Sequence, residues 1–284
     1  MMYSYGFSIG AKLLARGKVK PALRHLIIPV SYWRTTEFGL TMRYGEFTPE
    51  DRILDIGSPK LLALYLAKRL GADVYSTDID DYFIPEYKAL SDIEHLSPER
   101  FHVERQDGRS LTYPDTFFDK VFSVSVIEHI PDHGDSECMR EIARVLKPGG
   151  RCLLTVPFSP QSSDQYRNGR DFYWSGASSQ KDDGSVFFQR RYSEQDLHDR
   201  LIAPSGLSLR QALFVGERVF TDSCREFFER LPPLTHPLMG PIQAPLASLL
   251  QTAPCASWRD LKKPLCAFLV LVKEPAHSEH ANVG

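Results

Sequence analysis

The chain has 284 residues, 42% hydrophobic and 25% charged, which suits one large α/β domain with additions or two small domains and argues against a disordered chain. Its 34 basic and 36 acidic side chains nearly cancel, which argues against a nucleic-acid-binding protein, since such a protein needs an excess of Lys and Arg. The five cysteines form no C-x-x-C pair, so neither a zinc site nor a disulfide framework is indicated, and we expect a cytoplasmic location.

The N-terminal segment, residues 1–50, is predicted to form one or two helices that serve as an extension or lid. Its charge is uneven: no acidic residue precedes Glu37, whereas the basic residues are Lys12, Arg16, Lys18, Lys20, Arg24 and Arg34. Two interpretations stay open, a solvated helix face and a surface that contacts an anionic membrane or partner. Because no run of 18 apolar residues occurs, we expect a soluble protein.

The next part of the chain alternates between strand-like and helix-like patterns. Strands are predicted at 52–57, 73–78, 101–106, 118–127 and 151–156, and helices at 59–70 and 135–147. In the first helix, we expect Ser58 to act as the cap and Pro59 to take the first helical position. This alternation predicts a doubly wound, mostly parallel α/β sheet with helices on both faces.

The C-terminal part is less regular. A polar, irregular stretch is predicted at 159–184, a helix at 193–201, a strand at 207–215, a Pro-rich insert within 217–262 and an apolar strand at 264–272. The predicted domains are therefore an extension at 1–50, a main domain at 51–273 and a flexible tail at 274–284.

Three residues follow predicted strands, at the sheet edge where α/β proteins bind ligands. Gly57 can take a positive φ and bring the backbone close to a ligand. Asp78 is placed to accept hydrogen bonds from the two hydroxyls of a ribose, although an acidic turn is the alternative. Asp107 can accept from the exocyclic amine of a base, with Gly108 leaving space beside it, or it is an Asx-turn residue.

Longer motifs carry a family resemblance. The runs 107–119, 121–130 and 144–150 resemble the small-molecule class I S-adenosylmethionine-dependent methyltransferases, and 53–57 with 75–78 extend the likeness over about 51–157. The resemblance implies seven strands, six of them parallel, with the last, at 264–272, antiparallel between the fifth and sixth.

The resemblance also implies a cofactor, S-adenosylmethionine, with S-adenosylhomocysteine as product. Its implied binding residues are Asp55, Gly57 and Ser58 in the loop on the methionine side, Asp78 with Ile79 at the ribose, Asp107 and Gly108 at the adenine, and Ser123, Val124 and Ser125 at the end of the fourth strand.

The expected reaction is methyl transfer (EC 2.1.1.-) by in-line displacement to a small-molecule, lipid-like or glycan-like acceptor, with oxygen as the expected acceptor atom. Glu128 and His129 are the candidate proton acceptors, or else part of the loop architecture. No metal is expected, because Ser125 stands where some quinone-type O-methyltransferases carry a metal-binding Glu.

The first loop departs from the family pattern. Pro59 and Leu61 occupy places where the family usually has glycine, so either the loop takes a different path that still admits the cofactor, or the protein is a non-catalytic binding or assembly protein. A nicotinamide-dependent oxidoreductase is a third hypothesis, disfavoured because this loop cannot cradle a pyrophosphate.

A cluster of aromatic and basic residues suggests where an acceptor would lie. The two interpretations are an apolar pocket with a cationic rim, for an acidic acceptor, and a loop packed on its own aromatics. The residues are Phe172, Tyr173, Trp174, Phe187, Phe188, Arg190, Arg191 and Tyr192.

Overall fold

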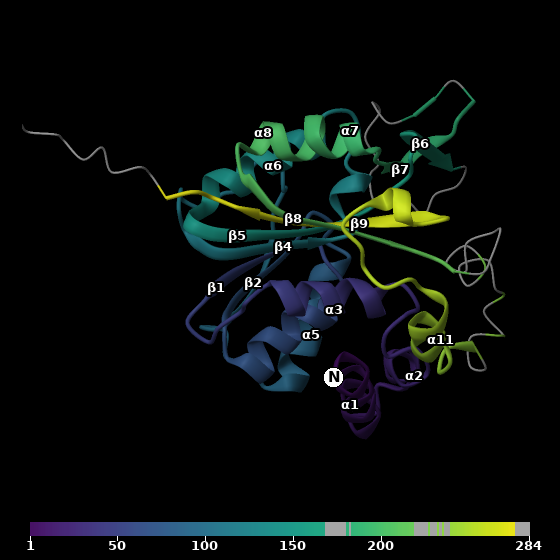
Figure 1. Ribbon diagram of the computed structural model, residues 1–284. Helices are drawn as coiled ribbons and strands as arrows, with labels where there is room; N and C mark the ends of the chain where they lie inside the picture. The colour runs from purple at the N-terminus through teal and green to yellow at the C-terminus, as the bar shows by residue number, and fades with distance from the viewer. Residues whose placement is uncertain are drawn as a thin grey trace, which may run out of the picture.

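The structure is a computed structural model that describes residues 1–167, 180–181, 183–218, 227, 232, 235 and 239–275 (Figure 1). Its centre is one seven-stranded sheet with the strand order β3-β2-β1-β4-β5-β9-β8. The strands are β1 (Arg52–Ile56), β2 (Asp73–Asp78), β3 (Phe101–Arg105), β4 (Phe118–Val124), β5 (Leu146–Pro157), β8 (Ser208–Gly216) and β9 (Pro264–Val272).

The strand directions confirm the predicted fold class. Strands β1 to β5 pair in parallel, whereas β9 runs antiparallel to both of its neighbours, β5 and β8. The last strand therefore lies between the fifth and sixth strands of the main sheet, as the resemblance implied. Strand β5 begins five residues earlier than predicted, because Leu146 already pairs with Phe118.

Two apolar clusters, one on each face of the sheet, form the core. Alternate residues of a strand contribute to opposite clusters: Leu153 belongs to one and Leu154 to the other, and Phe268 and Leu269 divide in the same way. This alternation explains why the central strands read as nearly continuous apolar runs, since both of their faces are buried.

Helices cover both faces of the sheet (Figure 1). One face carries the helices of the second half of the domain, and the other carries the N-terminal helices together with α4, α5 and α11. On the first face lie α6 (Gly134–Val145), α7 (Glu194–Asp196), the π-helical turn η4 (Leu197–Ile202) and α8 (Ala203–Ser205). On the second lie α1 (Met2–Ala15), α2 (Val19–Ile27), α3 (Arg34–Tyr44), α4 (Lys60–Tyr65), the π-helical turn η1 (Leu66–Leu70), α5 (Phe83–Glu94) and α11 (Gln243–Leu250). Two 3₁₀ turns, η2 (Ile127–His129) and η6 (Trp258–Asp260), complete the described helical elements.

The N-terminal segment forms three helices, so the prediction of one or two was wrong. Helices α1 and α2 pack closely because glycines remove side chains from their interface. A Cβ atom on Gly10 would lie 2.8 Å from Cγ of Leu26, too near for two carbon atoms. Among the described helices, none combines the length and the apolar character needed to span a bilayer.

The stretch predicted to be irregular contains a strand, β6 (Ser163–Arg167), which pairs with a second strand, β7 (Val186–Arg191), directly after the stretch. The two strands form an antiparallel hairpin, with Asp164 opposite Arg190. The sequence pattern concealed this hairpin because β6 is polar on both faces, so it lacks the alternation of a half-buried strand.

Candidate functional site

A cavity of about 520 Å³ lies at the carboxyl ends of β1 to β4. The four strand ends and the N-terminal helices contribute its walls. The lining includes Gly57, Ser58, Pro59, Lys60 and Leu61 after β1, Asp78, Ile79 and Asp80 at β2, Gln106, Asp107 and Gly108 after β3, Ser125, Val126, His129 and Ile130 after β4, and Arg24, His25, Pro29, Arg34 and Phe38 from the N-terminal segment. The structure thus brings together most of the residues that the sequence placed at a binding site.

Gly57 forms the tight turn after β1. Its φ is +62°, and a Cβ atom at this position would lie 2.8 Å from Cγ1 of Val126, so both the backbone conformation and the space require glycine. Its N–H donates to the carbonyl oxygen of Thr77 at 2.9 Å. The turn is therefore fixed against β2 while it faces the cavity.

Asp55 lies beneath the loop and is not among the residues that line the cavity. It is fully buried and accepts hydrogen bonds from the backbone N–H of Ser58 at 3.1 Å and from the hydroxyl of Ser76 at 3.0 Å. Burial raises the pKa of Asp55 to about 8. Its contacts shape the loop from below.

The start of α4 differs from the prediction. Ser58 does not cap the helix: its Oγ accepts from the N–H of Val124 at 2.8 Å and so joins the loop to β4. Pro59, with φ −58° and ψ 126°, precedes the first helical residue, Lys60. The prediction that Pro59 is the first helical residue was therefore wrong by one position.

Lys60, at the start of α4, and Tyr87, in α5, lie against the loop that follows β1. The Lys60 ammonium lies 4.3 Å from the ring centre of Phe83 and 3.7 Å from Oε2 of Glu86. Burial lowers the pKa of Lys60, although the carboxylates of Glu86 and Asp78 oppose this effect. The Tyr87 hydroxyl donates to the carbonyl oxygen of Ser58 at 2.7 Å, which holds the loop in place.

Asp78 ends β2 on the cavity wall. Its Oδ1 accepts from the backbone N–H of Asp80 at 3.0 Å. Burial raises the pKa of Asp78 to about 6, against the opposing hydrogen bond from Asp80 and the charge of Lys60. Ile79, beside it, also lines the cavity, and its carbonyl oxygen accepts from Arg105 Nε at 3.2 Å.

Asp107 lines the cavity and also makes the Asx-turn contact that was its alternative interpretation. Its Oδ1 accepts from the backbone N–H of Arg109 at 2.9 Å, and its Oδ2 accepts from Arg109 Nη2 at 2.7 Å. Partial burial raises the pKa of Asp107, but the hydrogen bonds from Arg109 outweigh it and leave the pKa below its usual value. The carboxylate is therefore held ionised beside Gly108.

The end of β4 meets a buried carboxylate that sequence reasoning missed. Glu37 of α3 is fully buried and accepts hydrogen bonds from Ser125 Oγ, from Thr155 Oγ1 at 2.9 Å and from Arg34 Nη1 at 2.6 Å. Ser125 has φ +51° and faces the cavity. The sequence signal was that Glu37 is the first acid after a wholly basic segment.

Ser123 and Val124 lie below the cavity floor. Ser123 is fully buried and its hydroxyl donates to the carbonyl oxygen of Ile56 at 3.3 Å. Neither residue lines the cavity. They join β4 to the first loop and support the site from beneath.

His129 lines the cavity, whereas Glu128 is fully buried behind it. The Nδ1 atom of His129 lies 2.5 Å from the carbonyl oxygen of Phe188 in β7. A carbonyl oxygen can only accept, so Nδ1 carries the hydrogen and Nε2 of the neutral ring keeps its lone pair. Nε2 lies 3.9 Å from Oε1 of Glu128.

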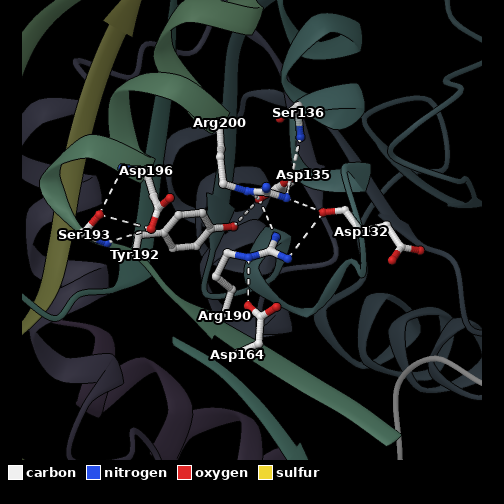
Figure 2. Close-up of polar contacts among 9 residues, drawn as sticks. All are labelled: Asp132, Asp135, Ser136, Asp164, Arg190, Tyr192, Ser193, Asp196 and Arg200. Atoms are coloured by element: carbon white, nitrogen blue, oxygen red, sulfur yellow. Dashed lines mark hydrogen bonds and ion pairs between the residues drawn. The ribbon is translucent and has the colours of Figure 1, made fainter. Parts of the chain in front are cut away.

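An ion-pair cluster fixes the hairpin that supplies Phe188 (Figure 2). The fully buried carboxylate of Asp135 accepts from Arg190 Nη1 at 2.9 Å, from Arg200 Nε at 2.8 Å and from the Tyr192 hydroxyl at 2.9 Å. Arg190 Nε also donates to Asp164 of β6 at 3.0 Å. The cluster joins both strands of the hairpin to the start of α6 and to η4.

For the described part of the aromatic and basic stretch, these contacts distinguish between an acceptor pocket and a loop packed on its own aromatic residues. Arg190 and Tyr192 are buried against Asp135, and neither they nor Phe187, Phe188 and Arg191 line the cavity. These five residues fit the packed-loop interpretation. Phe172, Tyr173 and Trp174 lie outside the described residues.

The sequence matches known proteins mainly through its central part. Residues 54–154 match the family model described as a methyltransferase domain. The chain is 34% identical over 124 residues to a glycine/sarcosine/dimethylglycine N-methyltransferase of Actinopolyspora halophila, covering 42% of this chain and 20% of that protein. It is 32% identical over 104 residues to the methyltransferase GfsG of Streptomyces halstedii, covering 36% of each. The chain spans less than half the length of the curated relatives it matches.

The fold matches solved structures over most of the chain. The YcgJ protein of Bacillus subtilis superposes with a TM-score of 0.52 at 17% identity, covering 85% of this chain and 99% of that one. The cyclase SpnF gives 0.56 at 21% identity, covering 86% and 83%. A structure titled as SAM-dependent methyltransferases from Methanosarcina mazei gives 0.51 at 16% identity, covering 83% and 98%.

Proposed function

We propose that this chain binds S-adenosylmethionine and transfers the methyl group to a small molecule, because residues 54–154 match a methyltransferase-domain model and the sheet has the fold of the class I methyltransferases. The observation that carries the proposal is the convergence of Gly57, Asp78 and Asp107 on one cavity. These residues come from three different strand ends, and a purely structural role would not require their side chains and turn to face the same space.

The cavity fits this cofactor in size and charge. Its volume of about 520 Å³ lies within the range of small-molecule sites. Four carboxylates line it, from Asp78, Asp80, Glu86 and Asp107. Glu86 lies 3.7 Å from nitrogens of both Lys60 and Arg24, and Asp107 is paired with Arg109. The acidic groups of Asp78 and Asp80 therefore suit a ligand that carries a sulfonium cation. Asp78 would hold the ribose hydroxyls, and Asp107 would accept from the adenine amine beside Gly108.

The residues on the acceptor side would position the acceptor and remove its proton. S-adenosylmethionine supplies an electrophilic methyl group, so the protein needs no covalent intermediate. We assign the proton to Nε2 of His129, because Nδ1 donates to the carbonyl oxygen of Phe188 and the neutral ring therefore carries its basic lone pair on Nε2. This assignment favours a hydroxyl acceptor, since an alcohol or phenol must lose a proton during methylation.

The departures at Pro59 and Leu61 support a loop with a different path. Leu61 is nearly buried and belongs to the apolar core, while the backbone around Ser58 is held by Tyr87 and Val124. The cavity remains open beside these residues. The alternative, a non-catalytic methyltransferase-fold protein, is favoured only by the loop sequence and by the likeness in fold to a protein named as a cyclase.

Calorimetric titration with S-adenosylmethionine and S-adenosylhomocysteine tests the proposal. We expect saturable binding by the wild type and affinity about 10- to 100-fold lower for Asp78→Ala, because hydrogen bonds to a charged group are lost. Asp81→Ala is the matched control: this neighbouring carboxylate is 80% exposed and is not among the lining residues. Failure of both ligands to bind at millimolar concentration overturns the proposal.

The acceptor is a separate question. Mass spectrometry of small molecules that co-purify with the protein, followed by their incubation with labelled S-adenosylmethionine, would identify it. If S-adenosylhomocysteine binds but no co-purified molecule accepts label, the non-catalytic alternative gains support. Labelling at nitrogen or carbon would contradict the assignment to oxygen.

A further inference from the structure

The solvent-facing side of the N-terminal hairpin, formed by α1 and α2, carries an apolar stripe. Tyr3, Phe7 and Leu14 follow one another at helical spacing on α1, and Val19 and Leu23, one helical turn apart, are exposed on α2, which packs beside it. Each of these five side chains is between 36% and 53% exposed. We name these five residues the hairpin stripe.

This clustering is unusual for the molecule. Of the eleven large apolar side chains that are exposed in the described part of the chain, six lie within the first 23 residues. Single exposed apolar residues are normal on a protein surface, but a group on one small element marks an interaction site. Folding alone does not account for the stripe, because the opposite side of α1 already packs into the core through Tyr5, Ile9 and Leu13.

The charged side chains of α1, of α2 and of their connection are all positive, although Arg24 lies 3.7 Å from a carboxylate oxygen of Glu86 in α5. Lys18 and Lys20 lie exposed in and beside the connection from α1 to α2, and in the described residues neither makes an ion pair. Arg16 and Arg24 lie at the two sides of this connection, and no acidic residue occurs before Glu37. Lys12, by contrast, points to the other side and pairs with Glu94 at 2.8 Å.

We propose that the hairpin stripe and its lysines bind the surface of an anionic lipid membrane. An interfacial helix combines exposed aromatic and aliphatic side chains with Lys and Arg, and here both kinds come from α1, α2 and their connection, which lie at one end of the molecule (Figure 1). A second copy of the chain is a poorer occupant, because a two-fold contact through this face would bring like charges together.

The proposed surface adjoins the cavity. Arg24 and His25 of α2 line the cavity, while Leu23 of the same helix belongs to the hairpin stripe. Membrane binding would therefore hold one wall of the cavity against the lipid. The proposal does not depend on methyl transfer, and its tests need neither cofactor nor acceptor.

Co-sedimentation of the full chain with lipid vesicles tests the proposal. We expect binding to vesicles of equal parts phosphatidylcholine and phosphatidylglycerol, little binding to pure phosphatidylcholine, and weakening by salt. Reversing both lysines, Lys18→Glu with Lys20→Glu, should lower the partition constant at least about 25-fold, at roughly fivefold for each charge removed. Phe7→Ser with Leu14→Ser should lower it at least about tenfold.

Matched controls on other surfaces complete the test. Leu209→Ser removes an exposed leucine from β8, and Lys262→Glu reverses an exposed lysine far along the chain. Both should leave the partition constant within about twofold of wild type. Circular dichroism melting checks that each variant folds.

Three outcomes would overturn the proposal. The first is no sedimentation with the anionic vesicles, and the second is equal loss of binding in the control variants. The third is a dimer of the wild type in sedimentation velocity that Phe7→Ser converts to a monomer, which would assign the face to a second copy of the chain.

Discussion

The carbonyl oxygen of Phe188 lies 2.5 Å from Nδ1 of His129 and thereby selects the tautomer of the ring that borders the cavity. The two residues come from different parts of the fold, the turn after β4 and the second strand of the β6–β7 hairpin. The phenylalanine ring also stands edge to face with the imidazole, with centres 5.0 Å apart. The hairpin therefore orients the candidate proton acceptor through one backbone atom and one ring.

We expect His129→Gln to lower the rate of methyl transfer by about 10²- to 10⁴-fold, the usual contribution of a general base. The affinity for S-adenosylhomocysteine should stay near the wild-type value, because the proposed cofactor contacts lie at other strand ends. Single-turnover kinetics with the identified acceptor and calorimetry would separate the two effects. His133→Gln, an exposed neighbour outside the cavity lining, is the control, and equal rates for both variants would exclude His129 as the base.

Gly57→Ala should weaken the binding of S-adenosylhomocysteine and destabilise the protein by about 1–3 kcal/mol. The substitution adds a Cβ atom 2.8 Å from Val126 in a backbone with φ +62°. Gly71→Ala is the matched control, because it has φ +81° but nothing within 4 Å of the added atom and lies away from the cavity. Urea unfolding and calorimetry should show a cost in stability for both variants but a loss of affinity only for Gly57→Ala.

The part of the site at the ends of β1, β2 and β3 was predictable because it depends on local sequence patterns. Strand, turn and helix follow from apolar periodicity and glycine. Asp78 ends one strand that the pattern marks clearly, and Asp107 lies two residues after another. The contribution of Glu37 was not predictable. Its contact with Ser125 joins residues 88 positions apart, and no periodicity encodes which helix will cover a strand end.

The predicted cap of α4 was wrong for a similar reason, a contact between residues far apart in the sequence. Ser58 directly before Pro59 matches the local pattern of a helix start, but its hydroxyl instead accepts from Val124 of β4. A tertiary hydrogen bond therefore took the place of the local one. The polar hairpin β6–β7 was not predicted for the same reason, since Arg190 donates to both Asp164 and Asp135 and so fixes the hairpin without an apolar face.

Asp135→Ala should destabilise the protein by about 3–5 kcal/mol, because it removes the buried carboxylate that pairs with Arg190 and leaves only the partly exposed Asp164 as its carboxylate partner in the described residues. The hairpin should also lose its fixed position. The rate of methyl transfer should then fall, because Phe188 of the hairpin would no longer orient His129. Urea unfolding and proteolysis of the hairpin would measure these effects. Asp199→Ala, an exposed carboxylate on η4, should leave both unchanged.

The buried carboxyl of Asp55 predicts an unusual dependence of stability on pH. Its pKa of about 8 in the folded protein exceeds the ordinary value near 4 of the unfolded chain. Between these values the folded state binds a proton that the unfolded state releases, so the free energy of unfolding falls as pH rises.

Asp55→Asn should remove this contribution, since a neutral amide replaces the protonated acid. Urea unfolding across about pH 5 to 7 should show a slope less negative than that of wild type, by up to about 1.4 kcal/mol per pH unit. Asp119→Asn is the control: burial raises the pKa of Asp119, but the hydrogen bond from Lys147 outweighs it and lowers the pKa, so its effect belongs to more acidic solution. Equal slopes for wild type and Asp55→Asn would contradict a raised pKa.

Asp78 predicts how cofactor affinity varies with pH. Its pKa is raised to about 6 by burial, and only the ionised carboxylate accepts hydrogen bonds with both oxygens. Affinity for S-adenosylhomocysteine should therefore fall as pH drops through 6. Calorimetry at about pH 5 and about pH 8 should show the difference in wild type and not in Asp78→Asn.

The central place of β9 has a consequence for how the chain assembles. Strands β1 to β4, whose ends build the cavity, come from residues 52–124 and can pair as neighbouring β-α-β units. Strand β8 has no described partner in the main sheet except β9, which lies far along the chain and must first insert beside β5. The ligand-facing half of the sheet is thus built from strands that are close in sequence, whereas the other half needs a long loop closure, and we expect that closure to be the slow step of folding.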